Sequence, residues 1–534
     1  MDKDAKTPKT PVPVQTVAAI DIGANSLRMV IAEVLSDGKI RVLDKLQRAV
    51  RLGQDTFRYG RLSGPTMRSA IAVLRDYRQV LDFFNVEQIR AVATSAVREA
   101  SNSDTFLDRI FMATSLDIEV IVTSEESRLT VSAVREALAD SVAKDGSPAL
   151  IADVGGGNTI LTILHKGEIT EYHSLPLGSV RLQEVLSTTN ELPDRAAEIL
   201  QQQISNEISN IQTALPLKKI KRFIAVGGDI RFAARQIGKP TESSDLHTIS
   251  RTKFDKFVQR CEHYSTKDLA KRYGIPFADA ETLNPALLVY KLLLQATRSQ
   301  EIIVSQVTMR DGLLLDLIRR ATGKEDPAIS KGVIHSALAM AEKHRVDLNH
   351  AQNVAELSVQ LFDKLQSEHG LGQRYRLLLR VAALIHEIGG FISNRAHHKH
   401  SYYLISNSEI FGLTRNETIA VAHVARYHRR SCPKPSHLEY MNLPRERRMV
   451  ISKLAAILRV ADALDASHTQ QVHKIRCERR EEAFVIYITG VADLSLKRRA
   501  IAIKGDMFED IYGLKVRLED DGLSLQKPIR HENK

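Results

Sequence analysis

The feature that most constrains the fold is a glycine turn between two apolar segments in residues 151–164. The first segment runs into Asp153, three glycines follow at 155–157, and β-favouring apolar residues resume at Ile160. Glycine lacks a Cβ and accepts a positive φ, so consecutive glycines can direct their N–H groups toward an anion beside the carboxylate. The stretch predicts either a hairpin that binds phosphate with a divalent cation or a tight hairpin with a capping aspartate.

A second copy of this pattern lies near the start of the chain, in residues 18–32. An apolar strand ends in Asp21, a turn of small residues runs from Gly23 to Ser26, and apolar residues follow. Asp21 precedes Asp153 by 132 positions, a separation of domain size. The repeat therefore predicts two similar α/β lobes, each presenting a hairpin to a common cleft.

Length and composition are those of a globular protein with several cores. The 534 residues predict about three to four domains, and 43% apolar with 26% charged residues excludes a disordered chain or a disulfide scaffold. Cys261, Cys432 and Cys477 fit free thiols in a reducing compartment and lack zinc-site spacing. Without a membrane-spanning apolar run or a signal-peptide core, we expect a cytoplasmic protein that does not bind membranes.

The net charge of +11 favours polyanionic partners. Only 5% of the residues are aromatic and none is tryptophan, which leaves little material for stacking on bases and argues against nucleic acid. Inorganic polyphosphate and nucleotides stay as candidates, and a solvated basic surface is the alternative without function.

Periodicity predicts a strand at 40–53, a helix at 64–84 and a strand at 88–93 in the first lobe. Arg98 follows the last of these strands on a turn. Ligands in α/β proteins bind at the carboxyl ends of strands, so Arg98 is a candidate phosphate clamp or else an arginine on a surface helix.

Two adjacent acids begin the next helix. A strand predicted at 117–123 leads into a helix at 124–138, with Glu125 and Glu126 in its first turn. Acids there complement the helix dipole, which is the structural interpretation. The functional interpretation is a general base held at the cleft.

The second lobe is predicted to continue with a helix at 192–215, a strand at 223–226 that leads to Gly227 and Gly228, a helix at 284–297, a strand at 301–305 and a closing helix at 311–320. Residues 321–327 form a predicted linker. The expected domains are a disordered lead-in (1–13), a first lobe (14–145), a second lobe (146–323), a helical domain (328–470) and a small α/β unit (474–525).

Seven ordered motifs resemble the exopolyphosphatase and guanosine pentaphosphate phosphohydrolase family over about residues 16–320. They are DIGANS at 21–26, ATSAVR at 93–98, SEESRL at 124–129, DVGGG at 153–157, LPLGSVRL at 175–182, GG at 227–228 and MRDGLLLDL at 309–317. The resemblance implies two RNase H-like lobes of the actin-like ATPase superfamily with the active site between them. It also implies Mg²⁺ as cofactor and a homodimer.

The resemblance also implies roles for individual residues. Glu126 matches the general base that removes a proton from the attacking water, Asp153 and Gly155 match catalytic positions of the glycine turn, and Asp21 with Asp153 would bind the metal. The matching phosphate contacts are Asn25, Ser26, Arg98, Gly156, Gly157, Asn158, Gly227 and Gly228. The implied chemistry is in-line attack of water on a terminal phosphorus.

Three positions depart from the family pattern. Ile160 stands where the family has a catalytic glutamate seven residues after the aspartate, Asn158 replaces a serine, and Asp229 replaces a hydroxyl residue.

One hypothesis for the function is an exopolyphosphatase that also acts on guanosine pentaphosphate. The alternative is a protein that binds polyphosphate or guanosine polyphosphate with weak or no turnover, while a phosphotransferase lacks any acceptor-site motif.

The helical region resembles the HD-type domain that long family members carry. Its matching residues are His350, the His386-Glu387 pair and Asp462, which predict either a metal site or core histidines.

Between residues 426 and 448 there are seven Lys or Arg against two acids. A solvated face is one meaning of this run, and the resemblance implies a polyphosphate channel formed by His398, His400, Arg426, His428, Arg429 and Arg430.

Overall fold

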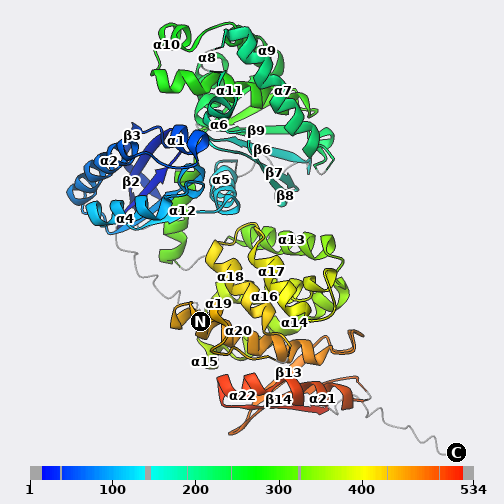
Figure 1. Cartoon of the computed structure of the whole chain (residues 1–534). Helices are drawn as coiled ribbons and strands as arrows, with labels where there is room; N and C mark the ends of the chain where they lie inside the picture. The colour runs from blue at the N-terminus through cyan, green and yellow to red at the C-terminus, as the bar shows by residue number, and fades with distance from the viewer. Residues whose placement is uncertain are drawn as a thin grey trace, which may run out of the picture. The chain divides into compact units, whose positions relative to one another are not determined.

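The computed structural model describes residues 15–35, 39–138, 146–188, 191–213, 215–241, 243, 245–322, 326–429, 431–491 and 493–520. These residues form two compact units that divide between Ile329 and Ser330 (Figure 1). The predicted lead-in at 1–13 and Arg430 lie outside the described residues. Each unit is described by itself below.

The first lobe of the first unit is built on a five-stranded sheet in the order β3-β2-β1-β4-β5. β1 and β2 are antiparallel, and β1, β4 and β5 are parallel. The strands are β1 (Gln15–Ile22), β2 (Ser26–Val34), β3 (Ile40–Ala49), β4 (Gln88–Ala93) and β5 (Ile118–Val120). β5 is shorter than the predicted strand at 117–123, and α5 (Thr123–Leu138) begins at the last residue of the predicted strand.

Helices cover both faces of this sheet. α1 (Leu52–Tyr59), α2 (Gly64–Phe83), α3 (Ser95–Arg98) and α4 (Ser103–Thr114) belong to the first lobe. The predicted helix at 64–84 is confirmed as α2, which begins after the N-cap Ser63 and packs Leu74 into one core. On the other face, α5 and α12 (Met309–Thr322) place Leu129 and Leu313 against the sheet.

The second lobe repeats the strand order of the first. Its sheet runs β10-β11-β12-β9-β6-β7-β8, so the order β8-β7-β6-β9-β12 matches β3-β2-β1-β4-β5. The strands are β6 (Ala149–Val154), β7 (Thr159–His165), β8 (Glu168–Leu175), β9 (Arg222–Val226), β10 (Lys239–Pro240), β11 (Leu246–Ser250) and β12 (Glu301–Ser305). The predicted pair of RNase H-like lobes is confirmed.

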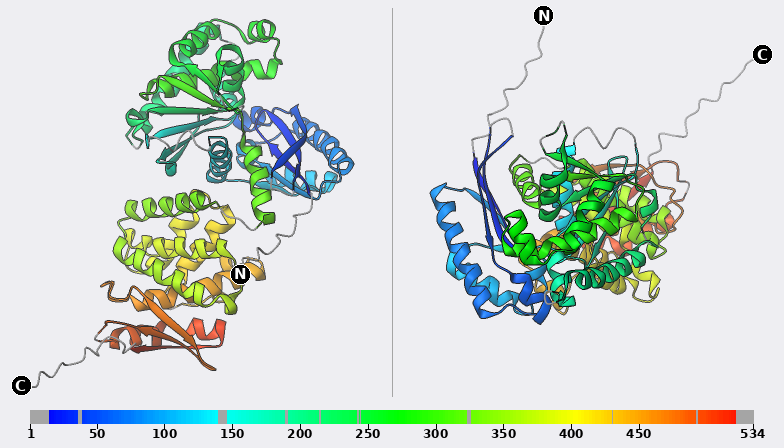
Figure 2. Two further views of the ribbon diagram at one scale, coloured as in Figure 1. Left: turned by 180° about the vertical axis from the view of Figure 1, so that it is seen from behind. Right: turned by 90° about the horizontal axis from the view of Figure 1, so that it is seen from above.

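A buried helix forms the centre of the second lobe, and Figure 2 shows the helices around its sheet from two further sides. α11 (Phe277–Gln295) begins seven residues before its predicted start at 284 and contains Pro285. Its apolar residues pack with α7 and α9 in a single core. The other helices are α6 (Ser179–Leu186), α7 (Pro193–Ile211), α8 (Gly228–Ile237), α9 (Arg251–Glu262) and α10 (Thr266–Tyr273).

The second unit is helical and ends in a small sheet. Its helices are α13 (Pro327–Lys343, which spans the division), α14 (Leu348–Lys364), α15 (Gln366–His369), α16 (Gln373–Ile385), α17 (His397–Ser406), α18 (Arg415–Arg426), α19 (Leu438–Met441) and α20 (Arg445–Leu464). The terminal α/β part contains β13 (Ile475–Arg479), β14 (Ala483–Ile488), α21 (Ser495–Lys504), α22 (Asp506–Tyr512) and β15 (Lys515–Asp520). Among the described helices, none is long and apolar enough to cross a membrane.

Candidate active site

The two predicted hairpins have the same geometry. In the first, the Gly23 amide donates to the Ser26 carbonyl at 3.2 Å, and in the second the Gly155 amide donates to the Asn158 carbonyl at 2.9 Å. In each hairpin, the aspartate on the first strand pairs directly with the residue seven positions later on the second strand. Asp21 faces Arg28 on β2, while Asp153 faces Ile160 on β7.

The glycine turn is explained by close packing, which corrects the expectation of positive φ at 155–157. None of these three is among the described glycines with positive φ. A Cβ on Gly157 would lie 2.0 Å from Ser95 Oγ, so only glycine lets α3 of the first lobe approach this turn. Gly227 does need glycine's freedom, because its φ is +148° and a Cβ would lie 2.5 Å from Tyr290 Oη.

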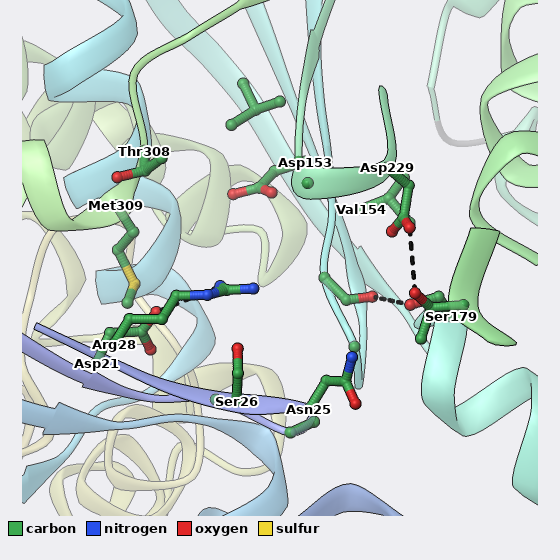
Figure 3. Close-up of a pocket in the computed structure, with 18 of the residues that line it drawn as sticks. Asp21, Asn25, Ser26, Arg28, Asp153, Val154, Ser179, Asp229, Thr308 and Met309 are labelled. Atoms are coloured by element: carbon green, nitrogen blue, oxygen red, sulfur yellow. Dashed lines mark hydrogen bonds and ion pairs between the residues drawn. The ribbon is translucent and has the colours of Figure 1, made fainter. Parts of the chain in front are cut away.

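A cleft of about 420 Å³ lies between the lobes and is lined by both hairpins (Figure 3). The sequence-predicted residues that line it are Asp21, Asn25, Ser26, Glu126, Asp153, Gly155, Gly156, Gly157, Asn158, Gly227 and Gly228. Ser26 Oγ is buried without a hydrogen-bond partner among the described residues. An unpaired buried hydroxyl beside a cleft is available to a ligand.

Glu126 lies in the first turn of α5 and is 7% exposed. Burial raises the pKa of its carboxyl to about 7, against the opposing effect of Arg98. Arg98 Nη1 donates to Glu126 Oε1 and to the Ile121 carbonyl, each at 2.5 Å. Arg98 thus holds the carboxylate and is not among the described residues that line the cleft, so its phosphate contact stays a prediction.

Glu125, the neighbouring acid, has a different environment. It is 1% exposed and accepts from Arg90 at 3.0 Å and from two nitrogens of Arg128 at 2.7 Å each. Arg128 also donates to Asp316 of α12 at 3.0 Å. The first acid of the pair therefore anchors α5 to its neighbours, while the second faces the cleft.

The two aspartates place negative charge on opposite walls of the cleft. Burial raises the pKa of Asp153 to about 6, and the charge of Asp21 adds to that rise. Thr130 Oγ1 of α5 donates to Asp153 Oδ2 at 2.9 Å. Two carboxylates, one of which raises the pKa of the other, are a donor set that fits a divalent cation.

Three arginines that no sequence motif indicated as ligand contacts also line the cleft: Arg28, Arg231 and Arg310. Arg310 Nη1 lies 3.4 Å and Arg28 Nη1 lies 3.7 Å from Asp21 Oδ2. Nη1 of Arg231 is buried without a partner among the described residues. Burial and the charges of the other two arginines lower the pKa of Arg231 to about 10. The three cations therefore repel one another in the cleft, and an anion bound there would relieve this repulsion.

Ile160 is 4% exposed and is not among the described residues that line the cleft. Its ladder partners are Asp153 on β6 and Ser174 on β8. Side chains directly opposite in an antiparallel pair have Cβ atoms about 5 Å apart. The position at which the family pattern has a glutamate is thus occupied here by an apolar side chain next to Asp153.

In the second unit, the structure brings His350, His386, His428 and Asp462 together. His350 Nδ1 lies 2.9 Å from Asp465, and Nδ1 of His386 lies 2.7 Å from the Ala383 carbonyl. Nε2 of both histidines is buried and without a hydrogen-bond partner among the described residues. Lys504 Nζ donates to Asp462 Oδ2, which supplies a cation at this cluster. Metal binding by His350, His386, Glu387 and Asp462 stays a prediction.

The residues predicted to form a polyphosphate channel have unequal exposure. Arg429 is exposed, and His398, His400 and Arg426 are half-buried. His428 is 1% exposed, and its Nδ1 lies 2.6 Å from the Ala425 carbonyl. Arg429 is therefore the most exposed of these residues, and the polyphosphate channel stays a prediction.

Comparisons with known proteins agree with this geometry. Residues 30–321 match the model of the Ppx/GppA phosphatase family, and residues 334–499 match its domain III. A guanosine-5'-triphosphate,3'-diphosphate pyrophosphatase of Aeromonas hydrophila is 25% identical over 474 residues, covering 88% of this chain and 91% of the relative. A protein of the same name from Aliivibrio fischeri is 25% identical over 450 residues, covering 83% and 86%.

Among solved structures, an exopolyphosphatase from Cytophaga hutchinsonii has a TM-score of 0.51 and 21% identity, covering 58% of this chain and 99% of that chain. This likeness supports the two-lobed fold. The family match covers more than half of the sequence and includes the second hairpin, Glu126 and Arg310. The chain therefore belongs to the Ppx/GppA phosphatase family.

Proposed function

We propose that this protein hydrolyses the terminal phosphate of inorganic polyphosphate or of a guanosine polyphosphate. The observation that carries the proposal is the position of Glu126, a buried carboxyl with a pKa of about 7 in the same cleft as Asp21, Asp153 and converging arginines. A general base works best when its pKa is near the operating pH.

Water attacks the terminal phosphorus while the bond to the bridging oxygen breaks, and the shortened phosphate leaves with that oxygen. Glu126 accepts the proton of the water, and Arg98 holds its Oε1 in place. Arg28, Arg231 and Arg310 bind and orient the phosphate oxygens, whose negative charge they balance. Positioning and charge neutralisation supply most of the rate enhancement in this chemistry.

Asp21 and Asp153 would hold Mg²⁺, because each has a carboxylate at the cleft and the charge of Asp21 raises the pKa of Asp153. When bound, Mg²⁺ supplies positive charge to the phosphate oxygens. The requirement is tested by removing divalent cations with a chelator and restoring them one at a time.

Phosphate release from guanosine 5'-triphosphate 3'-diphosphate and from polyphosphate tests the proposal. The wild type should release phosphate from at least one of them, and Glu126→Gln should lower kcat by a factor of about 100 or more. Asp108→Asn is a matched control, since Asp108 is an exposed acid of α4 outside the cleft lining. Equal rates for wild type and Glu126→Gln would contradict the role of the base.

A second candidate is a protein that binds these anions with little turnover. Ile160 favours it, because an apolar side chain beside Asp153 neither binds a cation nor orients water. Ile160→Glu separates the two candidates. If activity appears only in this variant, the natural protein is a binding protein, whereas activity in the wild type excludes that candidate.

A further inference from the structure

Two buried imidazoles of the second unit, those of His350 and His386, are each held in one orientation. Nδ1 of His350 lies 2.9 Å from Asp465 Oδ2, and Nδ1 of His386 lies 2.7 Å from the Ala383 carbonyl. Both partners are acceptors, so each Nδ1 carries a hydrogen and Nε2 of the neutral ring keeps its lone pair. Both Nε2 atoms are buried without a partner among the described residues, and such fixed lone pairs are the form in which histidine binds a cation.

Asp462 of α20 adds a carboxylate to these imidazoles. It is 5% exposed, and its Oδ1 lies 3.7 Å from Nε2 of His350. One of its oxygens also lies within 4.8 Å of ring nitrogens of His386 and His428. Imidazole and carboxylate at such spacing are the donor types that hold Zn²⁺ in proteins. The donors alone therefore fit the metal ion that the resemblance to an HD-type domain implies.

The charge at the cluster does not fit a metal ion, because a lysine is already bound there. Lys504 at the end of α21 donates from Nζ to Asp462 Oδ2, and its side chain is only 19% exposed. This ammonium group neutralises a carboxylate that would otherwise be buried without a counter-charge. A divalent cation on the same carboxylate would lie next to a like charge, which costs free energy at this distance.

Lys504 is held at its backbone as well as at its side chain. Arg459 of α20 is fully buried, and its Nε donates to the Lys504 carbonyl at 2.8 Å. Nη2 of Arg459 lies 2.5 Å from Asp506 of α22. Arg459 and Asp462 are three positions apart and so share one face of α20. Two contacts from this face therefore fix the ammonium group at the cluster.

We infer that Lys504 takes the place of a metal ion in the second unit, where its ammonium group supplies the positive charge that binds Asp462 and joins α20 to the terminal α/β part. This assignment departs from the metal site implied by the resemblance, and it does not depend on the proposed function of the cleft. Two consequences follow. The natural protein excludes divalent cations from the cluster, and removal of the ammonium group opens a site for them.

Calorimetric titration of the chelator-treated full chain with Zn²⁺ tests both consequences. Lys504→Met keeps the apolar stem and removes the charge, so it should bind an additional Zn²⁺ at least about 100-fold more tightly than the wild type does at this cluster. Zn²⁺ bound in the cleft is common to both proteins and cancels in the comparison. Adding His386→Gln to Lys504→Met should abolish the gained binding. Lys515→Met, at an exposed lysine of β15, is the matched control and should bind as the wild type does.

Thermal unfolding followed by circular dichroism gives a second readout. Lys504→Met should have a lower Tm than the wild type without metal, because a buried carboxylate loses its partner. Zn²⁺ should raise the Tm of this variant more than that of the wild type, since it replaces the missing charge. Lys504→Arg keeps a cation and should respond to Zn²⁺ as the wild type does.

The metal content of the purified wild type decides the inference even if Lys504→Met fails to fold. Equal metal content in the wild type and in His386→Gln supports it. A metal ion that the wild type holds and His386→Gln loses would overturn it. A folded Lys504→Met that binds Zn²⁺ no better than the wild type would overturn it as well.

Discussion

Glu126 and Arg98 form an ion pair at 2.5 Å, which would set the pH range of the proposed activity. Burial raises the pKa of Glu126 to about 7, and Arg98 is the largest influence in the opposite direction. A base must be deprotonated to accept a proton, so we expect kcat/KM to rise with pH through about 7.

Arg98→Gln removes the cation that favours the charged carboxylate, so the pKa of Glu126 should rise and the pH profile should move to higher pH by about one unit. The measurement is kcat/KM across the range from pH about 5 to about 9. Arg195→Gln, at an arginine that is 63% exposed, is the control and should leave the midpoint unchanged. An Arg98→Gln profile that coincides with the wild type would show that this pair does not set the titration.

The sequence indicated most of the cleft residues but not its arginines. The motifs identify Asp21, Glu126 and Asp153 because each lies near the end of a strand or in the first turn of a helix. Arg28 could have been found from the hairpin register, which places it opposite Asp21. Arg231 comes from a part of the chain that meets the hairpins only in the folded lobe, and no local pattern reports such a contact.

At the scale of elements, α5 carries Glu126 and is joined to the rest of the first unit by ion pairs. Its Glu125 contacts Arg90 of β4 and Arg128 of its own helix, and Arg128 contacts Asp316 of α12. Breaking a buried ion pair by removing one partner leaves an uncompensated charge and costs about 3–5 kcal/mol.

Glu125→Gln should therefore lower the free energy of unfolding of the first unit by about 3 kcal/mol or more. Glu126→Gln, one residue away, removes a buried carboxyl whose ionisation burial already disfavours, so it should not destabilise the protein at neutral pH. Urea unfolding of both variants followed by circular dichroism measures the difference. Equal stability of the two variants would mean that the Glu125 network does not anchor α5.

The sequence predicted the elements with long periodic apolar patterns. It did not predict the short strands, whose formation depends on contacts with other elements. The helices predicted at 64–84 and 192–215 correspond to α2 and α7. Both could be predicted because apolar residues at helical spacing indicate the buried face of a helix. The strands β10 and β11 extend the second sheet beyond the repeat, and β10 has only two residues. The pairing of such short strands depends on the sheet edge they join, which their own residues do not encode.

At the scale of the whole first unit, one arginine connects the two lobes. Arg181 of α6 spans them, because its Nε donates to the Gly157 carbonyl at 2.6 Å and its Nη2 to Glu99 of the first lobe at 2.6 and 2.8 Å. Its guanidinium also lies over the Phe57 ring at 4.2 Å. This residue couples the glycine turn to the opposite lobe.

Arg181→Ala should lower kcat/KM by about tenfold or more, because a charge-assisted hydrogen bond is worth about 1.5–3 kcal/mol and the turn would lose its link to the first lobe. Arg181→Lys should recover only part of the activity, since lysine lacks the planar fork. Steady-state kinetics with circular dichroism to verify folding is the measurement. Full activity in Arg181→Ala would show that this bridge does not position the glycine turn.

The mechanism proposed for this protein is attack of water, activated by Glu126, on a terminal phosphorus in the cleft. The most direct test is phosphate release from guanosine 5'-triphosphate 3'-diphosphate in water enriched in oxygen-18, with binding measured on the same samples. We predict one labelled oxygen per released phosphate for the wild type. Glu126→Gln should release phosphate more slowly by a factor of about 100 or more, although it binds the ligand with similar affinity. Tight binding by both proteins without phosphate release from either would contradict the claim.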